Sequence, residues 1–277
     1  MLYLYTLIGS RRAETMVGAR VVIIMPAHNE AQNLSKVLAE LRQHLPADKF
    51  QSTTIQGVIE TCLDADVVVI DDYSSDETAA VAVRLGAQVV SLPCNLGYGG
   101  AVQTGFKYAV ERGYDYAVML DADGQHDPSY VPALLAPVIA GEADVAIGSR
   151  FLGTVDYRVS WPKRVGMRIF AAIVAHFSKR PVTDPTSGFQ ALNRDALRFF
   201  ARDNYPSDYP DADTLLLLNY AGFRVVEVPV RMRERLTGLS MHSSWRVFYY
   251  IFKMFLAIFI VLLRQKTRGN AHRRARR

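Results

Sequence analysis

The chain has 277 residues, of which 50% are hydrophobic and 21% are charged, so it can bury a large core. This composition excludes wholesale disorder. A polytopic membrane protein is also excluded, because no run of about 18 or more apolar residues lacks a charge. Two cysteines exclude a disulfide framework and a tetrahedral zinc site, which makes a reduced compartment the default.

The net charge of +5 comes from one end of the chain. Residues 264–277 carry 7 basic residues and no acid, which leaves 25 Lys and Arg against 27 Asp and Glu in the body. A nucleic-acid-binding protein spreads its basic residues over a domain face, so no nucleic-acid partner is expected. We interpret the tail either as a solvated appendage or as a segment attracted to an anionic membrane surface.

Residues 1–20 are expected to form an N-terminal extension, and from Val21 short apolar runs alternate with segments of helical period. The expected strands are 21–26, 67–71, 87–92, 116–121 and 144–150. The expected helices between them are 30–44, 76–85, 98–112 and 129–140. Short runs rich in Val and Ile are typical of strands buried on both faces of a parallel sheet. The alternation therefore predicts a doubly wound α/β fold over residues 21–150.

Two stretches break this alternation. Residues 46–66 form a connection longer than the usual loop of about 2–6 residues. After residue 150 we expect an amphipathic helix at 161–177, loops around 181–189, a helix near 195–201 and a strand at 225–230.

The last expected element is an apolar helix at 245–263. Its 17 residues from Val247 to Leu263 contain one charge, Lys253. They span about 25 Å as a helix, short of the roughly 30 Å hydrocarbon layer of a bilayer. We therefore expect an amphipathic helix that lies in the membrane interface, or marginally inserts, with the helix at 161–177 as a second contact. Burial against a partner subunit in a homo-oligomer is the alternative.

Polar and acidic residues follow three of the expected strands, and ligands of open α/β sheets bind beyond the carboxyl ends of strands. These runs are Pro26–Glu30, Asp71–Asp76 and Asp121–Gln125. Asp121 and Asp123 leave their strand together, with Gln125 as a further oxygen donor. Hard oxygen ligands of this kind suit Mg²⁺ or Mn²⁺ that is shared with substrate phosphates. The alternative is that the two carboxylates merely cap a helix.

Two further features lie near these acids. The glycine-rich stretch 95–100 lacks the G-x-G-x-x-G spacing of a dinucleotide site and is expected to allow close backbone approach at a helix start. His126 is expected to be a solvated loop histidine, with a role as a ligand or base as the alternative.

Seven motifs, in order, carry a resemblance to glycosyltransferase family 2, and more closely to its polyprenyl-phosphate sugar synthases of the dolichol-phosphate mannosyltransferase type. They are VVIIMPAHNE, VVVIDDYSSDET, NLGYGGAVQTGF, MLDADGQHDP, AIGSRF, DPTSGFQALNRDAL and EVPVRMRERLTGLS. The resemblance covers roughly residues 21–263 and implies a GT-A fold, a nucleotide-sugar donor and a divalent metal, Mn²⁺ or Mg²⁺. It departs from the family pattern at the 46–66 insertion, at His28 in place of a tyrosine, and around Leu239–Met241.

The resemblance also implies residue roles. The implied nucleotide-binding residues are Pro26, His28, Glu30, Asp71, Asp72, Asp121 and Ala122. The implied metal ligands are Asp121, Asp123 and Gln125. The implied catalytic and acceptor-phosphate residues are Asp123, Arg150, Arg164, Arg235 and Ser240.

By resemblance, residues 21–244 form the catalytic domain, with a nucleotide-sugar part at 21–150 and an acceptor part at 151–244. The expected reaction is an inverting sugar transfer to a dolichyl or undecaprenyl phosphate, on the cytoplasmic face of a membrane. One alternative is a hydroxyl acceptor, for which Asp211 or Asp213 would serve as the base unless they cap a helix. The other is a non-catalytic nucleotide-sugar-binding membrane protein.

Overall fold

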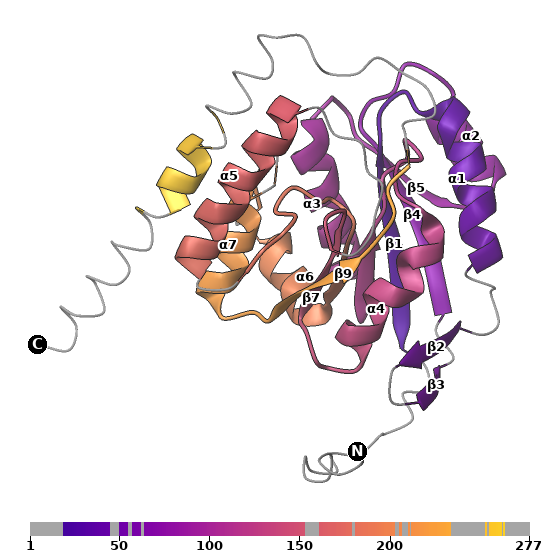
Figure 1. Cartoon of the computed structure of the whole chain (residues 1–277). Helices are drawn as coiled ribbons and strands as arrows, with labels where there is room; N and C mark the ends of the chain where they lie inside the picture. The colour runs from indigo at the N-terminus through magenta and orange to yellow at the C-terminus, as the bar shows by residue number, and fades with distance from the viewer. Residues whose placement is uncertain are drawn as a thin grey trace, which may run out of the picture.

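The computed structural model describes residues 19–44, 50–54, 57–61, 64–152, 161–178, 181–202, 205–206, 210, 212–233, 253, 255–261 and 263 (Figure 1). Its centre is a seven-stranded sheet with the order β5-β4-β1-β6-β8-β7-β9. The strands are β1 (Arg20–Ala27), β4 (Asp64–Asp71), β5 (Gln88–Ser91), β6 (Tyr116–Met119), β7 (Val145–Ser149), β8 (Gln190–Asn193) and β9 (Val225–Pro229). Only β8 is antiparallel to its neighbours in this sheet. The predicted mostly parallel, doubly wound fold is confirmed.

Helices cover both faces of the sheet. One layer contains α1 (Ala31–His44), α2 (Thr78–Arg84), the short η1 (Pro128–Tyr130) and α4 (Val131–Ile139). The other contains α3 (Gly97–Glu111), α5 (Trp161–Ser178), α6 (Arg194–Ala201) and α7 (Ala212–Ala221). The sequence analysis foresaw the helices up to α6, with boundaries that differ by a few residues.

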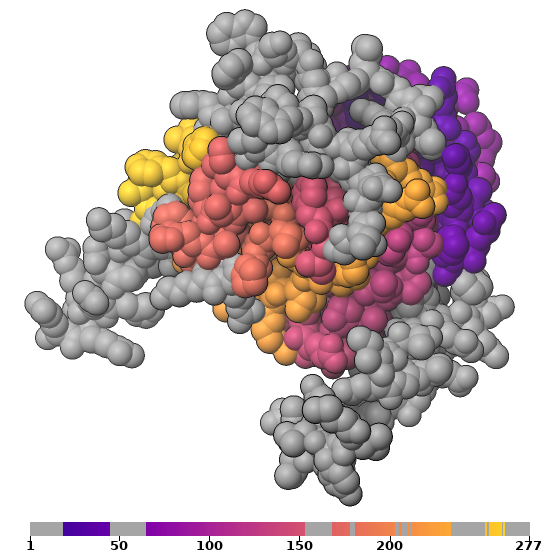
Figure 2. Space-filling model, viewed as in Figure 1, coloured from indigo at the N-terminus to yellow at the C-terminus, as the bar shows by residue number. Residues whose placement is uncertain are grey.

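The C-terminal helical residues 253, 255–261 and 263 pack beside α5 (Figures 1 and 2). The rings of Phe170 and Phe255 lie 5.4 Å apart, and Ile258 and Val261 are buried in the core shared with α5. Among the described residues, no helix is both long enough and apolar enough to cross a membrane. The basic tail at 264–277 lies outside the described residues.

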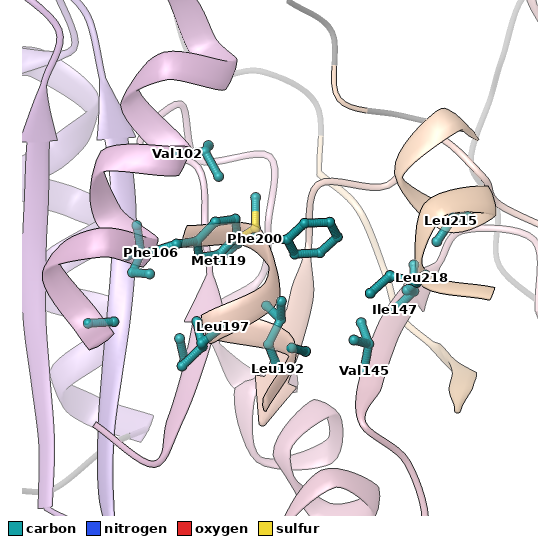
Figure 3. Close-up of a cluster of buried hydrophobic side chains, with 14 of the residues drawn as sticks. Val102, Phe106, Met119, Val145, Ile147, Leu192, Leu197, Phe200, Leu215 and Leu218 are labelled. Atoms are coloured by element: carbon teal, nitrogen blue, oxygen red, sulfur yellow. The ribbon is translucent and has the colours of Figure 1, made fainter. Parts of the chain in front are cut away.

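The central strands β1, β6 and β7 are buried on both faces, as their apolar composition predicts, whereas the edge strands β5 and β9 are only partly buried. Val22 and Ile24 of β1 face the layer that contains α3, whereas Ile23 and Met25 face the layer that contains α1. On the α3 side, aromatic and aliphatic side chains from α3, α6 and α7 meet over β6, β8 and β7 (Figure 3). Phe106 of α3 stacks on a ring of α6 at 5.7 Å between ring centroids. This packing fixes the strands from whose ends the candidate site is built.

Two parts of the fold were not predicted. The 46–66 segment contains an antiparallel hairpin of β2 (Phe50–Thr54) and β3 (Gly57–Thr61), which leads into the amino end of β4. The second is β8, which inserts between β6 and β7; its residues lie between the loops expected around 181–189 and the helix expected near 195–201 and were assigned to no element. Because β8 is antiparallel to both neighbours, β6 and β7 still run in the same direction and end at the same edge of the sheet.

Candidate active site

The loops that follow β1, β4 and β6 meet at one edge of the sheet. β1 lies between β4 and β6, with Ala27 paired to Asp71 and Ile24 paired to Met119. The three runs predicted from the sequence therefore leave neighbouring strand ends. This edge is where open α/β sheets bind their ligands.

At the end of β4, two buried carboxylates accept hydrogen bonds from backbone N–H groups. Asp71 Oδ1 accepts from the N–H of Ser74 at 3.1 Å, and Asp72 Oδ1 accepts from the N–H of Leu96 at 2.7 Å. Tyr73, which lies between Asp72 and Ser74, has a φ of 59°, which is rare for an aromatic residue, and its side chain is exposed. The two carboxylates thus bind the loop to itself and to the segment before α3.

At the end of β1, polar groups bind the loop to the β4 loop. His28 donates through Nδ1 to the carbonyl oxygen of Asp72 at 2.8 Å. The backbone N–H of Glu30 donates to Thr78 Oγ1 at 2.9 Å, and Glu30 Oε2 accepts from Asn33 at 2.6 Å. The carboxylate of Glu30 is buried at the start of α1, so it contributes to the shape of this loop. Pro26 lies in β1 itself.

The acidic loop, residues 121–127, follows β6 and carries the expected metal ligands. Asp121 Oδ1 accepts from the hydroxyl of Tyr98, on α3, at 3.0 Å. Asp123 Oδ1 accepts from the backbone N–H of Gln125 at 3.0 Å. Ala122, between the two acids, is buried and turns no functional group toward the site. The sequence analysis placed Asp121 in this loop but missed Tyr98, which lies in the glycine-rich stretch.

His126 is buried, with 4% of its surface exposed, so the expectation of a solvated loop histidine is wrong. Its ring stacks on Phe189 at 4.8 Å between centroids, and Nδ1 accepts from the backbone N–H of Asp121 at 3.0 Å. Burial lowers its pKa from 6.5 to about 4, so the ring is neutral at pH 7. The ring proton is therefore on Nε2, which lies 3.6 Å from Asp121 Oδ2.

Gly188 completes the surroundings of Asp121. A Cβ atom at this position would lie 2.7 Å from the hydroxyl oxygen of Tyr98 and 3.7 Å from Asp121 Oδ2. Any larger residue would therefore push the tyrosine away from the carboxylate. Asp121 is thus positioned by groups from α3, from its own loop and from the segment before β8.

The carboxylates of Asp121 and Asp123 suit a hard divalent cation. Within the part of the chain that the structure describes, no group of three or more His, Cys, Asp or Glu side chains converges as a metal site. Mg²⁺ and Mn²⁺ need no such cage, because one or two carboxylates can share them with substrate phosphates. The oxygen donors of Asp121, Asp123 and Gln125 fit that mode of binding.

Arg150 follows β7 and forms a buried ion pair. Its Nε and Nη2 atoms each donate to the carboxylate of Asp184 at 2.6 Å, and Nη2 also donates to Thr186. Asp184 is fully buried, and its backbone N–H donates to Glu227 of β9 at 2.8 Å. The sequence analysis named Arg150 but missed these two carboxylates, although both occur in the motifs that carry the resemblance.

The remaining predicted residues are less completely described. Arg164 lies in α5, whereas Arg235, Ser240 and Asp211 lie outside the described residues. Asp213 is buried in the first turn of α7, where its Oδ1 accepts from the backbone N–H of Thr214 at 2.9 Å. Asp213 is the second residue of α7 (Ala212–Ala221), so this bond to the next residue is not an N-cap bond, which would reach the N–H two or three residues later.

Comparisons with known proteins agree with this arrangement. The family model described as glycosyl transferase family 2 matches residues 22–200. The polyprenol monophosphomannose synthase of Mycolicibacterium smegmatis is 31% identical over 251 residues, covering 85% of both chains. The undecaprenyl-phosphate mannosyltransferase of Micrococcus luteus is 32% identical over 240 residues, covering 81% of this chain and 88% of its own.

The fold also resembles that of a solved structure. Glucosyl-3-phosphoglycerate synthase from Mycobacterium tuberculosis, crystallised with Mn²⁺ and UDP-glucose, superposes with a TM-score of 0.63. The match covers 88% of this chain and 79% of that chain, at 18% sequence identity. At this identity the likeness concerns the fold, which is the GT-A type that the resemblance implied.

Proposed function

The chain belongs to glycosyl transferase family 2 and is a glycosyltransferase, and we propose that it transfers a sugar from a nucleotide-sugar donor to a polyprenyl phosphate. The observation that carries this proposal is the meeting of the β1, β4 and β6 loops, which brings the carboxylates of Asp72, Asp121 and Asp123 to one sheet edge. The relatives named for polyprenyl-phosphate mannosyl transfer support the choice of acceptor.

On the donor side, Asp72 has one carboxylate oxygen on a backbone N–H and is suited to read a base through the other. Asp121 and Asp123, with Gln125, would hold Mn²⁺ or Mg²⁺ next to the diphosphate. The metal would neutralise negative charge on the departing nucleoside diphosphate. Tyr98 and His126 keep Asp121 in one orientation, so its carboxylate does not have to reorganise when the ion binds.

On the acceptor side, a phosphate is already ionised at neutral pH and needs no general base. It needs orientation, which arginines provide through paired N–H donors. Arg150 has a guanidinium plane fixed by Asp184, and we propose that it orients the acceptor together with Arg164, Arg235 and Ser240. Attack of a phosphate oxygen on the sugar carbon, opposite the leaving diphosphate, inverts the configuration at that carbon.

We place the enzyme at a membrane surface because α5 and the C-terminal helical residues, which lie side by side in Figure 2, both expose large apolar side chains. These large side chains, which are about two-fifths to one-half exposed, are Ile169, Phe177, Phe255, Leu256, Phe259, Ile260 and Leu263. Contiguous exposed apolar surface marks a docking site, and 7 basic residues follow it in the sequence. Such a helix pair suits peripheral binding on the cytoplasmic face, where the tail would meet anionic headgroups.

A transfer assay tests the proposal. The purified chain is supplied with a panel of UDP- and GDP-sugars, with and without undecaprenyl phosphate in anionic liposomes, and with Mn²⁺, Mg²⁺ or EDTA. We expect a lipid product with one of these donors, and no product in EDTA. Transfer to sugar hydroxyls but never to the lipid phosphate would contradict the acceptor assignment.

Attachment to the membrane is tested with a chain truncated after Ser244. This variant should still bind nucleotide but should no longer sediment with anionic liposomes, because it lacks the apolar C-terminal helix and the tail. If the truncation instead changes the assembly state while liposome binding persists, the helix belongs to a subunit interface. Size-exclusion chromatography of the same preparation distinguishes the two results.

A further inference from the structure

After β9 the chain continues at the carboxyl end of the parallel strands and reaches the acidic loop that follows β6. In this β9 extension, residues 230–233, Met232 forms an isolated antiparallel bridge with His126. The backbone N–H of Arg233 donates to the carbonyl oxygen of Gln125 at 2.8 Å. Segments far apart in the sequence are thus joined through their backbones at the loop that carries the proposed metal ligands.

The side chain of Arg233 reinforces this junction. Its Nη2 atom lies 3.0 Å from Asp127 Oδ2, at the end of the acidic loop, and its Nη1 atom donates to Glu40 of α1. All three side chains are mostly buried, with exposures of 34%, 16% and 24% for Arg233, Asp127 and Glu40. One guanidinium therefore holds the acidic loop, α1 and the β9 extension together.

The acidic loop is joined to the β9 extension close to its own turn. Gly124, at the centre of the loop, has a φ of 78°, and Gln125, whose carbonyl oxygen accepts from Arg233, also donates its backbone N–H to Asp123 at 3.0 Å. His126 is, with Tyr98, one of the residues that orient Asp121, and its backbone is paired to Met232. A change in the extension is therefore transmitted to the proposed metal ligands through Gln125 and His126.

We propose that Arg233 is a positioning residue that holds the acidic loop in the geometry required to bind a metal–nucleoside diphosphate. The inference rests on the proposed function, because the nucleoside diphosphate is the ligand that the function assigns to this loop. Arg233 does not touch the ligand in this proposal. It acts through Asp127 and through the backbone of Gln125.

The structure supplies a matched control at the other end of β9. Arg224 precedes the strand and forms an ion pair with Asp144, with its Nη2 atom 3.0 Å from Asp144 Oδ1. It lies at the amino end of β9, whereas the acidic loop lies at the carboxyl end of the parallel strands. Arg224→Gln and Arg233→Gln therefore remove the same charge from the two ends of one strand.

The first experiment needs no ligand. Hydrogen–deuterium exchange is measured on the full chain and on both variants, with peptides that cover residues 120–130. We expect faster exchange of this segment in Arg233→Gln and wild-type exchange in Arg224→Gln. Arg233→Lys keeps the positive charge but lacks the two guanidinium nitrogens that reach Glu40 and Asp127. Its exchange rate over this segment should lie between those of Arg233→Gln and Arg224→Gln. Unchanged exchange in Arg233→Gln overturns the inference.

The second experiment measures binding of UDP and of GDP, each with Mn²⁺, by isothermal titration calorimetry. Arg233→Gln should weaken the nucleotide that binds the wild type by roughly tenfold, since bonds to two part-buried carboxylates are lost. Arg224→Gln should bind as the wild type does. Equal losses in both variants, or a loss that only follows thermal stability, overturn the positioning role. A wild-type chain that binds neither nucleotide overturns the proposed function itself.

Discussion

The sheet has two halves along its strand order, the β4–β1–β6 side and the β8–β7–β9 side, and these hold their charged residues in different ways. On the β4–β1–β6 side, carboxylates accept from backbone N–H groups nearby in the fold, as Asp71 does from Ser74 and Asp123 does from Gln125. On the β8–β7–β9 side, charged side chains are paired with distant partners, as Arg150 is with Asp184. Asp71 and Asp123 thus accept from backbone N–H groups, Arg150 is held by a side-chain ion pair, and Arg233 joins the two sides through Asp127.

Because of this difference, we expect substitutions on one side to affect ligand binding and substitutions on the other side to affect stability. When a carboxylate that accepts from backbone N–H groups is replaced, no opposite charge is left buried without a partner. Its loss should therefore change ligand binding more than the free energy of unfolding. An arginine paired with a buried carboxylate leaves that charge uncompensated when it is removed. The same type of substitution should therefore affect activity on one side of the sheet and folding on the other.

The largest effect is expected on the β4–β1–β6 side. Asp123→Asn should lower kcat by about a thousandfold, because a proposed ligand of the ion that would stabilise the leaving group is lost. The free energy of unfolding should change by less than about 1 kcal/mol. Steady-state kinetics and urea denaturation measure the two quantities. Asp195→Asn, on the exposed start of α6, is the control that should alter neither. Near-normal turnover in Asp123→Asn would contradict the role.

On the other side, Arg150→Met should destabilise the fold by about 3–5 kcal/mol, because Asp184 is fully buried. Arg224→Met, which removes an arginine whose side chain is half exposed, should cost much less. The double variant Arg150→Met/Asp184→Asn should recover part of the stability while transfer to the lipid stays impaired. Urea denaturation of the three variants gives the comparison, and equal losses in the two single variants would contradict the account, in which the burial of Asp184 sets the cost.

The pH dependence of stability should carry a signature of His126. Its pKa is lowered by burial from 6.5 to about 4, so between these pH values the unfolded chain binds a proton that the folded chain does not. The histidine therefore makes stability fall as the pH drops through this window. In EDTA, His126→Gln should show a weaker fall than the wild type, whereas exposed His176→Gln should follow the wild type. Identical pH profiles for all three chains would show that His126 is not held neutral.

The smallest effect concerns the orientation of Asp121. Tyr98→Phe removes the hydroxyl that donates to its carboxylate and should weaken Mn²⁺ binding by about tenfold, the value of one charge-assisted bond. Tyr108→Phe removes a hydroxyl from the same helix, where it donates to Gln88, and should leave Mn²⁺ binding unchanged. Titration followed by the electron paramagnetic resonance of free Mn²⁺ measures both. Equal affinity in the two variants would exclude a role for Tyr98.

The sequence predicted most of the β4–β1–β6 side because its information is local. Runs such as 21–26 are apolar enough to be recognised as buried strands, and parallel strands place the residues that follow them at one edge. The sequence pattern alone was therefore enough to place Asp72, Asp121 and Asp123 together.

The rest depends on contacts that no local pattern encodes. β8 is a short strand that is defined by antiparallel pairing with β6 and β7. His126 lies among polar residues in the sequence, and its burial comes from Phe189, which belongs to a distant segment. The carboxylates that pair with Arg150 and Arg233 likewise come from distant segments. Burial of a polar residue by a remote partner leaves no periodic signal.

The central claim is that the oxygen of a lipid phosphate, and no hydroxyl, receives the sugar. The most direct test is ³¹P NMR of undecaprenyl phosphate incubated with the enzyme, Mn²⁺ and the donor that supports turnover. The account predicts that the phosphomonoester signal of the lipid is replaced by a phosphodiester signal, and that Asp123→Asn prevents this change. Sugar incorporation with the phosphomonoester signal unchanged would contradict it.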